Sequence, residues 1–367
     1  MKIGVDCGCL GVKDESLKVG VYQIVKNTLI ELSQIDKENE YLLYSFNPIE
    51  KEIIKALGNN FKNVIVRPIR GWMKLFLPLR IFRDRIDIFI GANQALPLKM
   101  PFSNYKSISI IYDIAFEKFP EIYSYAASVN KHKFYSERAA EADIVISISQ
   151  KTKDDLAKIY HASKNKIKLA YPGIVPLPEI SKYTLEDSYF LYVGALKKGK
   201  NIPTLIKAFA EFRKISKNKT KLLLAGGNKW IDPEIKLTLK EIPYTIKSDI
   251  HFLGAITKPE KLSSLYRGAI AFVSPSLYEG FGLPFVEAMS VGCPVIGSDR
   301  GSIPEIVGNS GLLFDAFDTR GIAGAMEKIA TNKEFREALS KKGLEKSKKY
   351  SFKNFANAIY SEVEKLK

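Results

Sequence analysis

Short apolar runs alternate along the chain with longer stretches in which apolar residues recur at helical spacing. In the first half, runs typical of buried strands lie at residues 2–6, 41–46, 64–66, 87–91, 107–112 and 143–148. In the second half, the corresponding runs lie at residues 189–193, 222–225, 250–253, 270–273 and 294–297. Near-continuous apolar strands separated by helices are typical of parallel sheets covered on both faces, so the pattern predicts an α/β protein.

Helical spacing is clear in two places. Apolar residues from Val21 to Leu32 recur at intervals of three and four, which predicts a helix between the first two strands. In the second half, Pro203 stands at a plausible first helical position ahead of a similar series from Leu205 to Phe212. The alternation of strand and helix therefore runs through both halves.

The length of 367 residues predicts two domains. Residues 172–178 contain three prolines and a glycine and are followed by charged residues up to Asp187, a composition that suits a connector. We therefore expect one domain at 1–172 and a second from 173 onward. Ligands of open α/β sheets bind beyond the carboxyl ends of the strands, so two such domains facing each other would form a deep cleft.

Charge and cysteine content narrow the classes of partner and compartment. Lys and Arg number 56 against 40 acidic residues, a net charge of +16 that indicates an anionic partner. Nucleic acid, an anionic membrane and a phosphorylated small molecule all fit this charge. Cys7, Cys9 and Cys293 are too few for a disulfide framework or a four-cysteine zinc site, and a reducing cytosol fits them. We see no secretory signal and no apolar stretch of the ~20 residues that a spanning helix needs.

The stretch around residue 280 has the strongest indication of chemistry. A predicted strand is followed by a loop with Gly280 and Gly282, and Pro284 stands where a helix should begin. The glycines let a ligand approach the backbone, and the free amides of a helix start favour an anion. Glu279 lies in the loop, and Glu287 is expected in the first turn, where it could accept hydrogen bonds from a ribose diol. The alternative is a tight turn in which Glu287 only complements the helix dipole.

Two glutamates with seven residues between them, including Gly-Phe-Gly-Leu-Pro, resemble the signature of the family-4 retaining glycosyltransferases, which have the GT-B fold. Further similar segments follow in the expected order over essentially the whole chain. They are residues 19–22, 112–114, 119–121, 191–196 with Lys200 and Asn201, 251–256, 292–296 and 302–308. The likeness is stronger in the second half than in the first.

The resemblance implies a fold of two Rossmann-like domains with parallel sheets that face a central cleft. Residues 1–172 would form the acceptor domain, with a C-terminal helix at about 350–367 packing back on it. Residues 173–349 would bind a nucleotide-sugar donor. Neither a metal nor another cofactor is expected, because the family acts without a metal and no metal-ligand cluster is evident.

The resemblance also implies a role for each matching residue. Glu287 would hold the ribose hydroxyls, and Lys200 would neutralise the diphosphate. Glu279, Lys200 and Asp113 are the expected catalytic residues. The remaining donor contacts would come from Gly20, Tyr112, Gly194, Ala195, Ala255, Ile256, Phe281, Gly282 and Leu283. A fixed cation and oriented amides would stabilise the negative charge of the leaving diphosphate.

Two positions depart from the family pattern. Ala195 stands where many members have arginine, although Lys197 or Lys198 could compensate. Tyr112 stands where histidine generally precedes the aspartate; its hydroxyl can hydrogen-bond a sugar or phosphate but does not titrate near neutral pH. Asp113 could instead end its strand or cap the next helix.

The segment at residues 67–85 combines arginines with large apolar residues. It could rest on an anionic bilayer, with each surface cation contributing ~1 kcal/mol. Pro78 argues against one long membrane helix. The alternative is a helix that packs its apolar side on the first sheet and leaves its arginines in water. A cytoplasmic enzyme on the inner face of the plasma membrane would fit the first interpretation.

We therefore expect a sugar transferred from a nucleotide donor, with GDP-mannose the first choice, to a glycan or lipid-linked glycan. A UDP-N-acetylglucosamine 2-epimerase would share the fold, but its acid-base chemistry needs histidine, and His132, His161 and His251 are poorly spaced for it. A catalytically degenerate nucleotide-sugar-binding protein would fit Ala195 and Tyr112. No nucleic acid partner is expected, because the signatures of RNA-recognition modules are missing.

Overall fold

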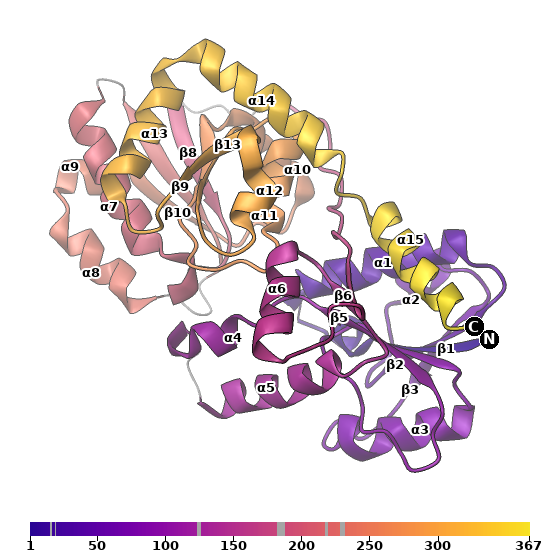
Figure 1. Cartoon of the computed structure of the whole chain (residues 1–367). Helices are drawn as coiled ribbons and strands as arrows, with labels where there is room; N and C mark the ends of the chain where they lie inside the picture. The colour runs from indigo at the N-terminus through magenta and orange to yellow at the C-terminus, as the bar shows by residue number, and fades with distance from the viewer. Residues whose placement is uncertain (15–16, 19, 123–125, 182–187, 217–218, 228–231) are drawn as a thin grey trace. The chain divides into compact units, whose positions relative to one another are not determined.

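The chain divides into two compact units, shown in a computed structural model (Figure 1). Unit one comprises Met1–Val175 together with Tyr350–Lys367, and unit two comprises Pro176–Lys349. The structure describes residues 1–14, 17–18, 20–122, 126–181, 188–216, 219–227 and 232–367. Val19 of the predicted glycine loop and residues 182–187 of the predicted connector lie outside the described residues.

Unit one contains a seven-stranded sheet in the order β3-β2-β1-β4-β5-β6-β7. Every strand pairs in parallel with its neighbours. The strands are β1 Lys2–Asp6, β2 Glu40–Ser45, β3 Phe61–Ile65, β4 Ile88–Gly91, β5 Lys106–Ile111, β6 Ile144–Ser147 and β7 Ile167–Leu169. Six of them match the predicted apolar runs. The sequence missed β7, which has three residues, only one of them buried, and so offers no apolar run.

Helices cover both faces of this sheet, as its alternating side chains require. They are α1 Val21–Ile35, α2 Lys51–Ala56, α3 Leu77–Asp84, α4 Ala115–Lys118, α5 Ala126–Ala140, α6 Gln150–Ile159 and α15 Phe352–Lys365. Val5 and Ile90 face α1 and Ile359 of α15, and Figure 1 shows these two helices side by side. Phe89 and Ile111 point the other way, into a core that α3 and α5 share.

Unit two contains a six-stranded sheet in the order β10-β9-β8-β11-β12-β13, again with parallel pairing throughout. The strands are β8 Ser188–Val193, β9 Thr220–Ala225, β10 Ile250–Gly254, β11 Ala271–Ser274, β12 Val295–Ser298 and β13 Gly311–Phe314. The sequence missed β13 as well, because all four of its residues are partly exposed. The predicted class, two α/β domains with parallel sheets, is confirmed.

The helices of unit two are α7 Ile202–Ile215, α8 Pro233–Glu241, α9 Tyr244–Lys247, α10 Pro259–Gly268, α11 Leu283–Ser290, α12 Ile303–Val307, α13 Thr319–Thr331 and α14 Lys333–Ser347. Prolines open α7 and α11, as predicted at Pro203 and Pro284. The core contains large aromatic side chains, such as Phe190 and Phe212, whose ring centroids lie 5.2 Å apart. Full burial of each such side chain contributes roughly 1.5–3 kcal/mol.

Candidate functional site

Two loops of unit two leave neighbouring strands at the point where the strand order reverses. β8 pairs with β11, but the strands that follow each of them along the chain lie on opposite sides. A crevice beyond the carboxyl ends opens at such a switch point, and ligands of open α/β sheets bind there. The loop at residues 194–201 follows β8, and the loop at residues 275–282 follows β11. These loops carry the predicted residues Lys200 and Glu279.

The structure brings Lys200 and Glu279 into contact although 79 positions separate them in the chain. The Lys200 ammonium forms an ion pair with Oε1 of Glu279, and the two side chains are 18% and 15% exposed. In such a partly desolvated place each charge stabilises the other. Burial raises the pKa of the nearby Tyr192 hydroxyl, and the Glu279 charge raises it further. The pair is therefore a fixed dipole at the switch point.

Asn201 holds the Lys200 loop in place through two hydrogen bonds of its side chain. Its side-chain amide donates to the carbonyl oxygen of Ala316 at 2.7 Å and to that of Pro275 at 3.2 Å. A backbone bond of 2.9 Å from Leu277 N to Gly199 O joins the two loops directly. These bonds position Lys200 and Glu279 without any ligand.

The Glu279 loop is held by the turn that follows β12. Ser302 donates its backbone N–H to the Glu279 carbonyl at 3.1 Å and its hydroxyl to the Phe281 carbonyl at 2.8 Å. Gly301 has φ of +60°, and a Cβ there would lie 2.7 Å from the backbone N and O of Glu279. Only glycine fits this close approach, so the turn after β12 packs directly against the Glu279 loop and supports it.

Helix α11 begins directly after this loop, at Leu283. Gly282 precedes it with φ of +96°, a backbone conformation that favours glycine. The first amides of a helix have no acceptor within it, and Pro284 carries no N–H at all. The amides of Gly282 and Leu283 thus lie at the positive end of the helix dipole, beside the Lys200–Glu279 pair.

Glu287 is the fifth residue of α11 and therefore lies in its second turn, not in the first as the sequence predicted. The Tyr266 hydroxyl of α10 donates to Oε2 of Glu287 at 3.1 Å. Burial raises the pKa of the Glu287 carboxyl, and the bond from Tyr266 partly offsets that effect. The carboxylate is one turn away from the helix start, where its interaction with the helix dipole is weak. The helix dipole therefore does not explain the position of Glu287. It can accept hydrogen bonds from a ligand's hydroxyl groups.

Glycines end three neighbouring strands of unit two. Gly194 N donates to Ala225 O at 2.9 Å, and Gly226 N donates to Gly254 O at 2.8 Å. A Cβ on Gly226 would lie only 2.0 Å from the Gly194 carbonyl oxygen. The same edge carries the predicted donor residues Ala195, Ala255 and Ile256, of which the two alanines are exposed. Sequence reasoning missed Gly226, although the pair Gly226-Gly227 after a predicted strand was a usable signal.

The other predicted site residues belong to unit one. Gly20 precedes α1 with φ of +54°, and a Cβ there would have no atom within 4 Å. The Tyr112 hydroxyl is buried and donates to the Ala92 carbonyl at 2.7 Å. The Asp113 carboxylate accepts the backbone N–H of Ala115, the first residue of α4, at 3.0 Å. Their part in donor binding or catalysis stays a prediction.

A polar cluster at the switch point of the first sheet, between β1 and β4, was not predicted. The Asp6 carboxylate accepts the Gly8 N–H at 2.9 Å, and Asn93 donates to the Asp6 carbonyl at 3.2 Å. Burial raises the pKa of Asp6 to about 6. Gln94 accepts the Tyr112 N–H at 2.9 Å and donates to the Asp113 carbonyl at 2.7 Å. A lone acid at a strand end is too common in sequences to single this cluster out.

Histidine and metal chemistry add little to these two clusters. Burial lowers the pKa of His132, whose ring stacks on Phe116, and the nearby Asp113 charge opposes that shift. In the part of the chain that the structure describes, no three His, Cys, Asp or Glu side chains are grouped to hold a metal ion. Metal independence stays a prediction.

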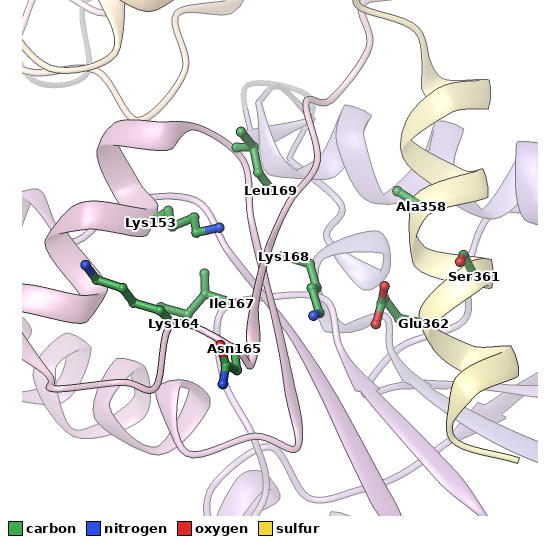
Figure 2. A pocket seen from close by; sticks show the side chains of 9 residues that line it. All are labelled: Lys153, Lys164, Asn165, Ile167, Lys168, Leu169, Ala358, Ser361 and Glu362. Atoms are coloured by element: carbon green, nitrogen blue, oxygen red, sulfur yellow. The ribbon is translucent and has the colours of Figure 1, made fainter.

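A hollow of about 500 Å³ in unit one contains none of the predicted site residues (Figure 2). It lies between α6, β7 and α15, and its lining includes Lys153, Lys164 and Lys168. Oε1 of Glu362 pairs with Lys365 at 2.6 Å, whereas its buried Oε2 has no hydrogen-bond partner. Figure 2 shows Lys168 and Glu362 pointing toward each other across the hollow.

Comparison with known proteins identifies the family. A family model described as "Glycosyl transferases group 1" matches residues 178–346, which include the Lys200–Glu279 pair. The chain is also 30% identical over 287 residues to O-antigen chain mannosyltransferase B of Escherichia coli, covering 75% of this chain and 73% of the relative. The chain belongs to the group 1 glycosyltransferases. The resemblance to family 4 is thereby confirmed.

Solved structures share the architecture of this chain over its full length. Sucrose-phosphate synthase from Thermosynechococcus elongatus superposes with a TM-score of 0.76 at 19% identity, covering 100% of this chain and 98% of that one. HepE of Anabaena, in complex with UDP-glucose, gives a TM-score of 0.71 at 15% identity, with 100% of both chains covered. This glycosyltransferase therefore has the GT-B fold. Among its described helices, none combines the length and apolar composition needed to cross a bilayer.

Proposed function

We propose that the protein is a retaining glycosyltransferase that moves mannose from GDP-mannose to a glycan or lipid-linked glycan. The observation that supports this most is the Lys200–Glu279 pair at the start of α11, inside the matched family segment. It places a cation, a carboxylate and helix-terminal amides at one switch point. A sugar diphosphate needs these groups in one place.

The proposed chemistry centres on the leaving diphosphate. As the bond from the anomeric carbon to the phosphate oxygen breaks, Lys200 and the amides of Gly282 and Leu283 stabilise the growing negative charge. The acceptor hydroxyl oxygen bonds to the same face of that carbon and passes its proton to the departing phosphate. Glu279 holds Lys200 in the free enzyme and hydrogen-bonds the sugar in the complex. We propose that this step needs no metal ion.

The donor's nucleoside would lie along the glycine-ended strands. Glu287 would accept the ribose hydroxyls, and backbone at Ala255 and Ile256 would contact the base, with Gly194 and Ala195 near the phosphates. Mannose and GDP are proposed because the relative from Escherichia coli is a mannosyltransferase. HepE, crystallised with UDP-glucose, makes UDP the competing nucleotide.

In this proposal unit two is the donor domain and unit one the acceptor domain. The roles of Asp113, Tyr112 and Gly20 of unit one stay expectations from the family resemblance. Nucleotide sugars are cytoplasmic metabolites, so we place the enzyme in the cytoplasm. The free Cys7 and Cys293, both buried, fit a reducing compartment.

A thermal-shift panel of GDP, UDP, ADP and their sugars tests the donor site. Stabilisation follows RT ln(1 + [L]/Kd), about 2.7 kcal/mol at a ligand concentration of 100 Kd. We expect one nucleotide class to raise the melting temperature, and Glu287→Ala to abolish the shift. Glu260→Ala, an exposed acid in the first turn of α10, is the matched control and should keep it. An equal shift in both variants would remove Glu287 from the site.

A nucleotide-sugar-binding protein without transfer activity is the second candidate. The inward hydroxyl of Tyr112 and the exposed methyl group of Ala195 favour it, because neither offers the donor a charged contact. The two functions differ in product. Transfer would release nucleoside diphosphate from the stabilising donor when a lipid-linked glycan extract is added, whereas a binding protein would give the shift without release. Family membership favours transfer over the 2-epimerase considered from the sequence.

A further inference from the structure

The basic segment, residues 67–85 of unit one, divides its apolar side chains between the core and the surface. It folds as a π-helical turn, Trp72–Phe76, that continues into α3. Trp72, Leu77 and Ile81 are buried in the core beside the first sheet. Packing on the first sheet, the alternative to membrane binding considered from the sequence, therefore accounts for these three residues.

A second set of apolar side chains in the same segment remains uncovered. Ile69 is 60% exposed, and Leu75, Leu79 and Phe82 are 48%, 44% and 52% exposed. The last three lie four and three positions apart, which is the spacing of one helix face. Packing on the sheet thus leaves a second apolar face, and we call these four residues the apolar face.

Cations surround the apolar face with little opposing charge. Arg67, Arg70, Lys74, Arg83 and Arg85 are all exposed. The only acid within residues 67–85 is Asp84, which accepts Arg80 Nε at 2.8 Å and the Tyr44 hydroxyl at 2.8 Å. Lys74 lies 5.4 Å from the ring centroid of Phe134, a 40% exposed residue of α5 that borders the segment. Exposed apolar side chains in a segment with one acid and several exposed cations match the boundary between anionic headgroups and acyl chains.

We propose that the apolar face and its arginines form a docking surface for an anionic bilayer. Leu75, Leu79 and Phe82 would enter the outer acyl region while Arg70 and Arg83 contact lipid phosphates. Nucleic acid fits less well, since three of the four residues of the apolar face are aliphatic and cannot stack on bases. The docking surface belongs to unit one, whereas the proposed donor groups belong to unit two. If the proposed function holds, docking would bring a membrane-borne acceptor to the enzyme.

Vesicle co-sedimentation of the full chain tests the apolar contribution. The variant Leu75→Ser/Leu79→Ser/Phe82→Ser removes three exposed groups, and Ile215→Ser/Leu237→Ser/Tyr244→Ser removes three even more exposed ones from unit two. With vesicles of phosphatidylglycerol and phosphatidylcholine at low salt, we expect the first variant to bind at least about tenfold more weakly than wild type. The control should bind like wild type. Unchanged melting temperatures check that both variants are folded.

The charge contribution has its own pair of variants. Arg70→Gln/Arg83→Gln should weaken binding to these vesicles roughly twentyfold, since each surface cation contributes about fivefold. Lys236→Gln/Lys240→Gln removes two exposed cations from α8 and should change binding little. Rising salt should release the wild-type protein, and vesicles of phosphatidylcholine alone should hold it poorly.

Three outcomes would overturn the proposal. The first is no binding of the wild-type protein at low salt. The second is an equal loss of binding in the apolar-face variants and their controls. The third is that the wild-type protein forms a dimer and Leu75→Ser/Leu79→Ser/Phe82→Ser is monomeric. The last would assign the apolar face to a second copy of the chain. Vesicle binding needs neither donor nor acceptor, so its failure would leave the glycosyltransfer proposal untouched.

Discussion

The carboxylates of Glu279, Glu287 and Asp6 differ in what surrounds them. Glu279 has a lysine partner, Glu287 has the hydroxyl of Tyr266, and Asp6 accepts bonds from uncharged groups only in the contacts described above. An opposite charge favours ionisation, and burial without one disfavours it. Burial therefore raises the pKa of both Glu287 and Asp6.

Asp6→Asn should change the pH dependence of stability. The folded pKa of Asp6, about 6, lies above its ordinary value of 3.8, so the folded chain binds this proton more tightly. The free energy of unfolding therefore falls as pH rises through that range, by roughly 3 kcal/mol in total. Asparagine removes this loss. Relative to wild type, the variant should gain stability above pH 6 and match it near pH 3.5 in urea unfolding followed by circular dichroism; parallel curves would contradict the assignment.

Lys200→Met should lower the turnover of the proposed transfer by about 100-fold, the usual effect of losing one preorganised group that stabilises transition-state charge. Donor affinity should fall less, because the diphosphate gains a further negative charge only as the sugar leaves. Release of nucleoside diphosphate, measured at saturating donor, gives the rate. Lys207→Met on α7, an exposed lysine, is the control. Equal rates in the two variants would place Lys200 outside the reaction.

At the scale of elements, the sequence predicts the strands that are buried, because burial gives them a run of apolar residues. It misses the strands that are partly exposed and have no such run. Eleven strands carry apolar runs because helices cover them, whereas β7 and β13 are short, partly exposed strands at sheet edges. The loop before α11 was predictable from Gly282 and Pro284, but the start of the helix placed Glu287 one turn later than expected. The contact between Lys200 and Glu279 follows from strand order, which spacing along the chain does not encode.

The glycines at the strand ends allow an element-level prediction. Gly226→Ala places a methyl group 2.0 Å from the Gly194 carbonyl, so the ends of β8 and β9 must separate. We expect a loss of about 1–3 kcal/mol in stability together with weaker nucleotide binding. Gly324→Ala on α13, where a Cβ meets no atom within 4 Å, should instead stabilise by about 0.5–1 kcal/mol. Thermal melts with and without nucleotide measure both effects.

At the scale of the whole molecule, each unit has its own sheet and core, and the proposed donor groups Lys200, Glu279 and Glu287 all belong to unit two. A ligand stabilises only the unit that binds it. The preferred nucleotide should therefore slow hydrogen exchange in peptides of β8 to β12 and leave β1 to β6 unchanged, as mass spectrometry would show. Equal protection of both sheets would contradict a donor site confined to unit two.

The last helix of the chain completes the first unit. α15 contributes the buried side chains Phe355, Ile359 and Val363 and packs beside α1. During synthesis on the ribosome, unit two leaves the exit tunnel ahead of these residues, so it can begin to fold while one face of the earlier unit still lacks its cover. The half of the enzyme that is translated first is then the half that matures last, and a nascent chain cut short by a late stop codon would leave it open to chaperones and proteases.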